Sequence, residues 1–170
     1  MSGRAAPVGS QELAELYAAH RLALVRMALL LVDHRAEAED VVHDAFASVL
    51  GRTLRDPDAV VGYLRTAVVN GCRSTLRRRR TARGYTPPVD TGPAPPDERA
   101  VLAEDHREVL AALDTLPARQ REVLVLRYWS GLSEAEIAET LGIGRGTVKS
   151  TASRALDALE KVITITQETR

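Results

Sequence analysis

Cationic and short hydroxyl side chains recur in one stretch near the C-terminus, "GIGRGTVKSTASRALDALEKV", which has the period of a helix. Its apolar positions repeat every three or four residues and are predicted to pack inward: Val148, Ala152, Ala155 and Leu159. The outward positions are then Lys149, Ser150, Ser153, Arg154 and Asp157. Lysine and arginine bind guanine edges in the major groove of DNA, and serine can bind any base. This face is therefore predicted to read DNA, with contact fading at Asp157, whose carboxylate phosphates would repel.

The residues before this stretch predict how the helix is presented. Ser133 followed by Glu136 has the spacing of a capping box, which fixes a helix start, and Gly142 is placed to be a left-handed stop. Thr147 is a plausible N-cap for the last helix. The whole pattern is a helix-turn-helix, with Arg145 and Thr147 at the leading end of the recognition helix, near phosphate.

A second cationic surface is predicted on a helix that starts after "RDPD". Its inward positions are Val60, Val61, Leu64, Ala67, Val68, Cys72 and Leu76, and its other face holds Thr66, Asn70, Arg73, Arg77 and Arg80. Four consecutive arginines end this stripe, with no acid between them. A charge run is often only a solvated face, but this uncompensated field also suits the phosphates of a polyanion. Thr66 and Asn70 add neutral groups that can read bases.

Acidic side chains share one face of the helix predicted within "DHRAEAEDVVHDAFASVL". Its inward stripe is Ala38, Val41, Val42, Ala45, Phe46 and Val49, and the opposite side holds Glu37, Asp40, His43 and Asp44. One interpretation is a magnesium site, as in all-α nucleotide pyrophosphohydrolases. Magnesium usually needs carboxylates from more than one element, and this domain has no second acidic motif. A solvated face, or a surface for a basic protein partner, is the preferred interpretation of Glu37, Asp40 and Asp44.

Motifs for covalent or cofactor chemistry are missing from the sequence. It contains no Gly-x-Ser-x-Gly, no P-loop and no dinucleotide glycine fingerprint, and its four histidines have no partner at ligand spacing. Cys72 is expected to be a small core residue. The sequence therefore predicts no catalytic residue, no cofactor and no metal.

Charge and composition divide the chain into two parts. The 170 residues have zero net charge, but residues 1–85 hold 13 basic and 9 acidic side chains, residues 86–104 hold 1 and 4, and residues 105–170 hold 9 and 10. The middle segment, "YTPPVDTGPAPPDERA", is proline-rich and reads as an extended tether. We expect an all-α protein with helical domains at 11–85 and 105–163, the second a helix-turn-helix, joined by the linker 86–104.

The first helix is expected to have one apolar face: Leu13, Leu16, Tyr17, His20, Leu24, Met27, Ala28 and Leu31. Within it, the apolar run "MALLLV" is far shorter than the roughly 18–20 residues that a membrane span needs. The single cysteine is compatible with a reducing cytoplasm, and no signal-peptide pattern is evident. The sequence thus favours a cytoplasmic protein without a membrane partner.

Four motifs, in order, resemble the extracytoplasmic-function (ECF) sigma factors of bacterial RNA polymerase, in the sigma-70 family: "AEDVVHDAF", "YLRTAVVNGCRSTLRRRR", "LPARQREVLVLRYWSGLSEAEIAETLGI" and "GTVKS". The tail "GTVKSTASRAL" is similar to an actinobacterial subgroup. The resemblance implies that residues 11–85 bind the polymerase clamp, on the β′ subunit, and open the minus-10 element. It also implies that residues 105–163 bind the minus-35 element and the β flap. An anti-sigma factor is a further possible partner, and no enzymatic activity is implied.

Some positions depart from the family pattern "GTVKSRLSRAR": Thr151, Ala152 and Leu156. A threonine at 151 puts the phosphate contact of an arginine there in doubt, and His43 and Leu50 replace a usual glutamine and tryptophan in the clamp-binding helix. Two rivals remain open at this point. An ordinary helix-turn-helix repressor or response-regulator effector domain would share the C-terminal helices, and the metal-dependent pyrophosphohydrolase would use the acidic face.

Overall fold

The computed structural model describes residues 8–32, 34–50, 52, 57–83 and 111–168, and it divides the chain into two compact units, Met1–Gly84 and Tyr85–Arg170. The described residues form helices and the turns between them, with no strand among them, so the predicted all-α fold is confirmed. The proposed linker, 86–104, lies outside the described residues. None of the described helices is long and apolar enough to cross a membrane.

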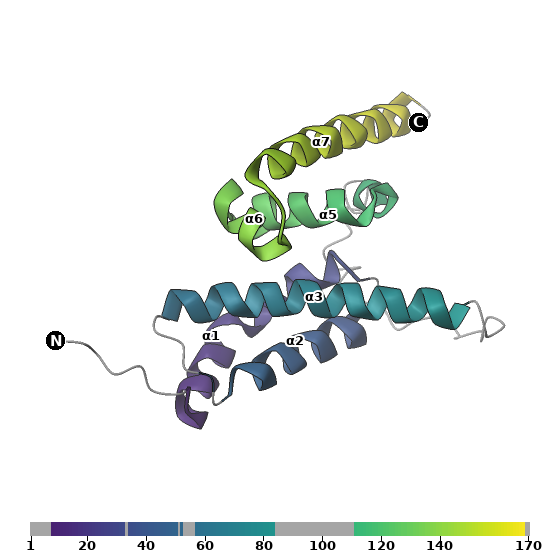
Figure 1. The fold of residues 1–170 in the computed structure, drawn as a ribbon. Helices are drawn as coiled ribbons and strands as arrows, with labels where there is room; N and C mark the ends of the chain where they lie inside the picture. The colour runs from purple at the N-terminus through teal and green to yellow at the C-terminus, as the bar shows by residue number, and fades with distance from the viewer. Residues whose placement is uncertain (1–7, 33, 51, 53–56, 84–110, 169–170) are drawn as a thin grey trace. The chain divides into compact units, whose positions relative to one another are not determined.

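The described residues of the first unit form three helices: α1 (Ser10–Leu29), α2 (Arg35–Val49) and α3 (Pro57–Arg83) (Figure 1). Polar contacts at both ends show that α2 runs antiparallel to α3. The Ser48 hydroxyl lies 3.2 Å from the Tyr63 hydroxyl, and the Glu37 carboxylate lies 3.4 Å from the Arg79 guanidinium. The third helix begins at Pro57, inside the "RDPD" turn rather than after it, as proline at a first helical position allows.

The core of this unit follows the predicted stripes closely on α2 and less closely on α3. All six predicted inward residues of α2 are buried: Ala38, Val41, Val42, Ala45, Phe46 and Val49. On α3, Val60, Leu64, Val68 and Cys72 are buried as predicted, whereas Val61, Ala67 and Leu76 are only partly buried. Val69, which was not predicted, is fully buried. Both α1 and α2 pack on α3, so its buried face is wider than a single stripe.

The first helix is buried mainly in its C-terminal half. Leu24, Met27 and Ala28 are buried as predicted, and Leu31 is buried just beyond the helix end. The N-terminal members of the predicted face, from Leu13 to His20, are half-buried. There the Tyr17 and Phe46 rings meet edge to face, with centroids 4.9 Å apart, and join α1 to α2.

Gly71 allows α2 and α3 to approach closely. A Cβ built on Gly71 would lie 2.6 Å from Cγ1 of Val41, a buried side chain of α2. Non-bonded carbon atoms do not come this close, so a larger residue at 71 forces the Val41 side chain or one of the two helices to shift. Gly62 lies on the same helix, and a Cβ there meets nothing within 4 Å.

In the second unit the described residues comprise helical residues 111–115, α5 (Ala118–Leu124), the π-helical turn η1 (Val125–Trp129), α6 (Glu134–Leu141) and α7 (Arg145–Glu168). The helix predicted over "ARQREVLVLRYWSG" therefore forms, but it ends in a π turn before Gly131, whose φ is +66°. Leu116, Leu124 and Ala155 form a buried cluster that joins the start of this unit to α7.

We expect Gly71→Ala to lower the free energy of unfolding of the first unit by about 1–3 kcal/mol, because overpacking a tight helix contact costs that much. Urea unfolding of the full chain, followed by circular dichroism, measures the change. Gly62→Ala is the matched control, and it should be neutral or stabilising by up to about 1 kcal/mol, since alanine is the better helix former. Equal midpoints for the two variants would contradict a role for this contact.

Candidate nucleic-acid interface

The helix-turn-helix is built as the sequence predicts at its first helix. The backbone N–H of Glu136 donates to the Ser133 hydroxyl at 3.3 Å, and the backbone N–H of Ser133 donates to the Glu136 carboxylate at 2.8 Å. This reciprocal pair is the predicted capping box, which fixes the start of α6. At the other end, Gly142 adopts the left-handed conformation, with φ 63° and ψ 40°, and ends the helix.

The start of α7 differs from the prediction. Thr147 is not the N-cap, because α7 begins two residues earlier, at Arg145. The backbone N–H of Val148 donates to the carbonyl of Gly144 at 3.0 Å, so the first helical hydrogen bond starts at Gly144. Thr147 lies in the first turn with an exposed side chain, and its carbonyl accepts a hydrogen bond from the Ser150 hydroxyl at 3.2 Å. Glycine at 146 did not prevent the helix from starting before it.

The two faces of α7 are as predicted. Val148, Ala152 and Ala155 are buried, and Leu159 packs against the cluster of Leu116 and Leu124. On the outward face, Lys149, Ser153, Arg154 and Asp157 are exposed, as are Arg145 and Thr147, while Ser150 is half-buried. The first turns of α7, from Arg145 to Arg154, thus present cations and small polar groups, and an exposed apolar side chain, Leu156, follows them on the same face.

Two outward side chains of α7 are linked. The Arg154 guanidinium donates to the Ser150 hydroxyl at 3.3 Å, which directs the arginine toward the N-terminal end of the helix. Thr151 is buried, with 7% of its surface exposed. The side chain at position 151 therefore faces the protein interior and is not available to phosphate.

Arginine side chains brace α6 against α5 and η1, and the sequence analysis missed them. Arg119 donates to the carbonyl of Leu141 at 3.4 Å and pairs with the buried Glu122 at 3.3 Å. Arg127 pairs with Glu134 at 3.1 Å. The i,i+3 spacing of Arg119 and Glu122 was a usable signal, but the contacts to α6 depend on tertiary placement and had none.

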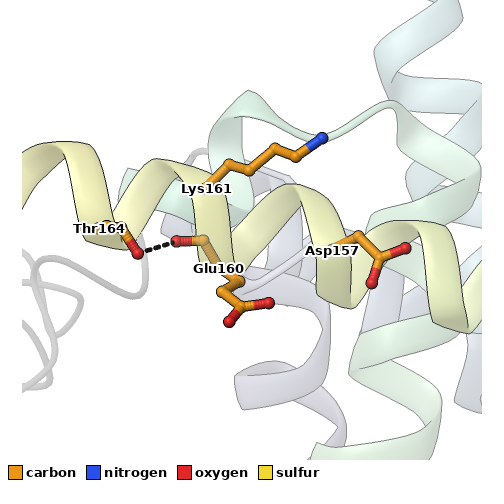
Figure 2. Close-up of a pocket in the computed structure, with 4 residues that line it drawn as sticks. All are labelled: Asp157, Glu160, Lys161 and Thr164. Atoms are coloured by element: carbon orange, nitrogen blue, oxygen red, sulfur yellow. Dashed lines mark hydrogen bonds between the residues drawn. The ribbon is translucent and has the colours of Figure 1, made fainter.

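A shallow hollow on the C-terminal half of α7 is lined by Asp157, Glu160, Lys161 and Thr164 (Figure 2). The Thr164 hydroxyl donates to the carbonyl of Glu160 at 2.9 Å, one turn back along the helix. Two carboxylates against one ammonium do not suit a phosphate. This half of α7 therefore differs in charge from the half that holds Lys149 and Arg154.

The predicted stripe on α3 is exposed toward its C-terminal end. Asn70, Arg77 and Arg80 are exposed, while Thr66 and Arg73 are half-buried. The Thr66 hydroxyl donates to the carbonyl of Gly62 at 3.1 Å, and Arg73 donates to the Asn70 side-chain oxygen at 3.1 Å. Of residues 51–60, which lead into α3, the structure describes 52 and 57–60.

The acidic face of α2 is not one uniform surface. Asp40 and Asp44 are exposed, as predicted, but Glu37 is not equivalent to them. Its side chain is 27% exposed and pairs with Arg79 of α3. Glu37 lies one turn before Asp40, where α2 passes close to the end of α3. Within the described residues, no group of three His, Cys, Asp or Glu side chains is arranged to hold a metal.

Each of the two units matches a known protein family. The family model for sigma-70 region 2 matches residues 16–82, and that for sigma-70 region 4 matches residues 106–159. The RNA polymerase sigma-E factor of Streptomyces coelicolor is 34% identical over 141 residues, which cover 82% of this chain and 78% of the relative. The ECF RNA polymerase sigma factor SigM of Mycobacterium tuberculosis is 33% identical over 151 residues, covering 88% and 76%.

Two solved structures share the fold. CnrH, solved in complex with the cytosolic domain of CnrY, is 26% identical with a TM-score of 0.69, covering 92% of this chain and 90% of that one. The sigma factor RpoE of Bartonella quintana, solved with the anti-sigma factor NepR, is 24% identical with a TM-score of 0.66, covering 91% and 98%. The two family matches, in this order, and the identity and coverage of the relatives lead to one conclusion. The chain belongs to the ECF sigma factors of the sigma-70 family, which direct promoter-specific transcription initiation by RNA polymerase.

Proposed function

We propose that this sigma factor recognises its promoter through two separate surfaces. Residues 105–163 bind the minus-35 element with the N-terminal half of α7, and residues 11–85 bind the minus-10 element with the outward stripe of α3. The clamp of the β′ subunit binds α2 in the first domain, the β flap binds the second domain, and residues 86–104 link the two. The chain acts by binding and not by catalysis, without a cofactor or metal, in the cytoplasm.

The observation that carries this proposal is the two-faced character of α7. Val148 and Ala155 are completely buried, so the rotation of the helix about its axis is fixed. That rotation exposes Lys149, Ser153 and Arg154 together on the outward side. A recognition helix contacts base edges with its N-terminal residues while the preceding helix crosses the DNA backbone. Small side chains on the first turns, Ser150 and Ser153, let the helix backbone come close to the groove there.

The outward residues of α7 divide into two kinds. Lys149, Ser150, Ser153 and Arg154 lie along the helix face, where we assign them to the groove floor or its rim. Arg145 and Thr147 lie in the first turn, where we assign them to phosphate at the mouth of the groove. The bond from Arg154 to Ser150 supports this division, because it orders the arginine before DNA is bound.

The minus-10 surface is assigned to Thr66, Asn70, Arg73, Arg77 and Arg80. Exposed Arg77 and Arg80 are suited to phosphates, and the Asn70 amide, ordered by Arg73, is suited to a base edge. The Thr66 hydroxyl already donates to the helix backbone, so Thr66 is assigned to this surface by its place on the stripe alone.

The polymerase surface is assigned to Glu37, Asp40 and Asp44, with the two aspartates as its exposed part. An anti-sigma factor is a further proposed partner. CnrH, to which this chain is 26% identical, was solved with a bound protein, the cytosolic domain of CnrY. The CnrY domain is the partner of CnrH, and a partner of this chain has to be identified by binding experiments with this chain.

Run-off transcription with purified core polymerase is the direct test. Addition of this chain should produce transcripts that start at one position on a cognate promoter. A helix-turn-helix repressor would bind DNA without core polymerase and give no transcript. A nucleotide pyrophosphohydrolase would consume nucleoside triphosphates in magnesium without core polymerase or DNA, and release of pyrophosphate under these conditions would contradict the proposal.

Replacing Lys149 or Arg154 by alanine should relax the preference at one base pair of the minus-35 element and cost about 1–3 kcal/mol of binding, as loss of a base contact does. Arg145→Ala should weaken all sequences alike and lower the salt slope by about one, as loss of a phosphate contact does. Holoenzyme binding to a library of minus-35 sequences, repeated at several salt concentrations, separates the two results.

Val148→Asp is the control for the fold of α7, because a buried, unpaired carboxylate should unfold the second unit rather than change base preference. If Lys149→Ala and Arg154→Ala both keep the parental preference and only lose affinity uniformly, α7 does not read bases through those side chains.

Reversing the charge of Asp40 and Asp44 together, by Asp40→Lys and Asp44→Lys, should weaken the binding of core polymerase. The change should leave the fold intact, since both side chains are exposed. Affinity for fluorescently labelled core polymerase measures the effect. Glu12→Lys and Glu15→Lys together, two exposed acids on α1, are the matched control and should leave the affinity unchanged. Unchanged core binding by the Asp40/Asp44 variant would remove this assignment.

A further inference from the structure

We propose that Arg79, although it belongs to the run of four arginines, is a positioning residue: it ties the DNA-facing end of α3 to α2 through Glu37 and does not neutralise phosphate. This inference rests on the proposed function, because it assumes that the stripe on α3 faces the minus-10 element. It gives Arg79 and Glu37 one shared role, where sequence alone would place one in a basic DNA surface and the other in an acidic polymerase surface.

Helical period already separates Arg79 from its neighbours. Cys72, Leu76 and Arg79 follow one another at i, i+4 and i+7, so Arg79 continues the inward face of α3. Cys72 is buried and Leu76 is half-buried, and Arg79 follows with 22% of its side chain exposed. Arg77 and Arg80, by contrast, continue the outward stripe and are exposed. The four arginines therefore point to at least two sides of the helix.

The groups around Arg79 come from the N-terminal end of α2. One guanidinium nitrogen lies 3.4 Å from the Glu37 carboxylate, and the other lies 3.4 Å from Nε2 of His34. Glu37 is in the first turn of α2, where the helix dipole favours a carboxylate. Both side chains of the ion pair are less than a third exposed, so water and salt screen the pair less than they screen a surface pair.

The location of the Arg79–Glu37 pair indicates what it does for the helix pair. The last turns of α3 extend past the N-terminal end of α2 (Figure 1), and the described side chains after Leu76 other than Arg79 are exposed. Apolar packing therefore fades just where the arginines that would meet DNA begin. The pair of Arg79 and Glu37 continues the α2–α3 contact by polar means, and it holds Arg77 and Arg80 at a fixed distance from the polymerase-facing helix.

Because Arg79 is already paired, it is a poor candidate for a phosphate contact. Moving it to DNA would break its bond to Glu37 and leave a half-buried carboxylate without that cation. Arg77 and Arg80 are exposed and would lose no such contact. Neutralising Arg79 should therefore affect promoter opening through the placement of its neighbours, and neutralising Glu37 should do the same.

The test uses holoenzymes that carry Arg79→Gln, Glu37→Gln or both changes, with Arg80→Gln as the matched control from the same arginine run. Promoter opening is followed by permanganate reactivity of the minus-10 thymines, and affinity for promoter DNA is measured at several salt concentrations. We expect Arg79→Gln and Glu37→Gln each to reduce opening roughly two- to fivefold, the range for loss of one partly exposed ion pair. The double variant should open the promoter no less than the more impaired of the two single variants, because both changes remove the same interaction.

The salt dependence separates positioning from phosphate contact. Arg79→Gln should leave the slope of log affinity against log salt unchanged, whereas Arg80→Gln should reduce its magnitude by roughly 0.7–0.9, the value for one lost phosphate contact. A slope change in Arg79→Gln like that in Arg80→Gln, or single effects that multiply in the double variant, would overturn the inference. Should Arg79→Gln fail to fold, Glu37→Gln decides alone. Opening is then measured with core polymerase saturated by the Glu37→Gln variant, so that a change in core affinity does not contribute. Glu37 cannot bind phosphate, so reduced opening at saturation supports the tie, and normal opening refutes it.

Failure of the proposed function would look different. If Arg77→Gln and Arg80→Gln together leave opening and salt slope at parental values, the α3 stripe does not face DNA, whatever Arg79 does. If Arg77→Gln and Arg80→Gln behave as phosphate contacts and Arg79→Gln shows the same slope change, the minus-10 assignment stands and the tie to Glu37 is wrong.

Discussion

The burial of one face of α7 determines what this protein can offer to DNA. Val148, Ala152 and Ala155 have almost no exposed surface, so the helix cannot rotate without exposing them. Lys149 and Arg154 are outward because those residues are inward, and no further contact is needed to choose their side. The capping box at Ser133 and the left-handed Gly142 then place α6, and with it the turn that leads into α7. The exposure of Lys149 and Arg154 thus depends on apolar packing at the opposite face of the same helix.

Sequence alone predicted the parts of the fold that follow from periodicity and local capping. The inward stripe of α2, both faces of α7, the capping box and the stop at Gly142 were all confirmed. These features are set within a few residues of chain. The family resemblance added the domain order and was confirmed by the matches to sigma-70 regions 2 and 4. The assignments of single residues to DNA and polymerase stay predictions, since they concern partners that the chain meets only in the assembled complex.

What sequence could not predict depends on where helices meet. Thr147 has the right type for an N-cap, but the first helical bond goes to the carbonyl of Gly144. Val69 is buried because α3 is covered by two helices, and Glu37 is half-buried and pairs with Arg79 because the end of α3 passes it. The burial of Val69 and the pairing of Glu37 were decided by tertiary contacts that overrode a reasonable local preference.

The arginine run shows why a charge pattern has to be interpreted with the helix period. Four like charges in a row look like one basic surface, but on a helix they spread around most of a turn. Only Arg77 and Arg80 share the outward stripe with Asn70, and Arg79, which continues the line of Cys72 and Leu76, turns toward α2. That side of α3 also carries Gly71, whose missing side chain lets α2 approach. The same helix pair is therefore held by close contact at its middle and by charge at its end, and this arrangement leaves Arg77 and Arg80 of the outward stripe exposed.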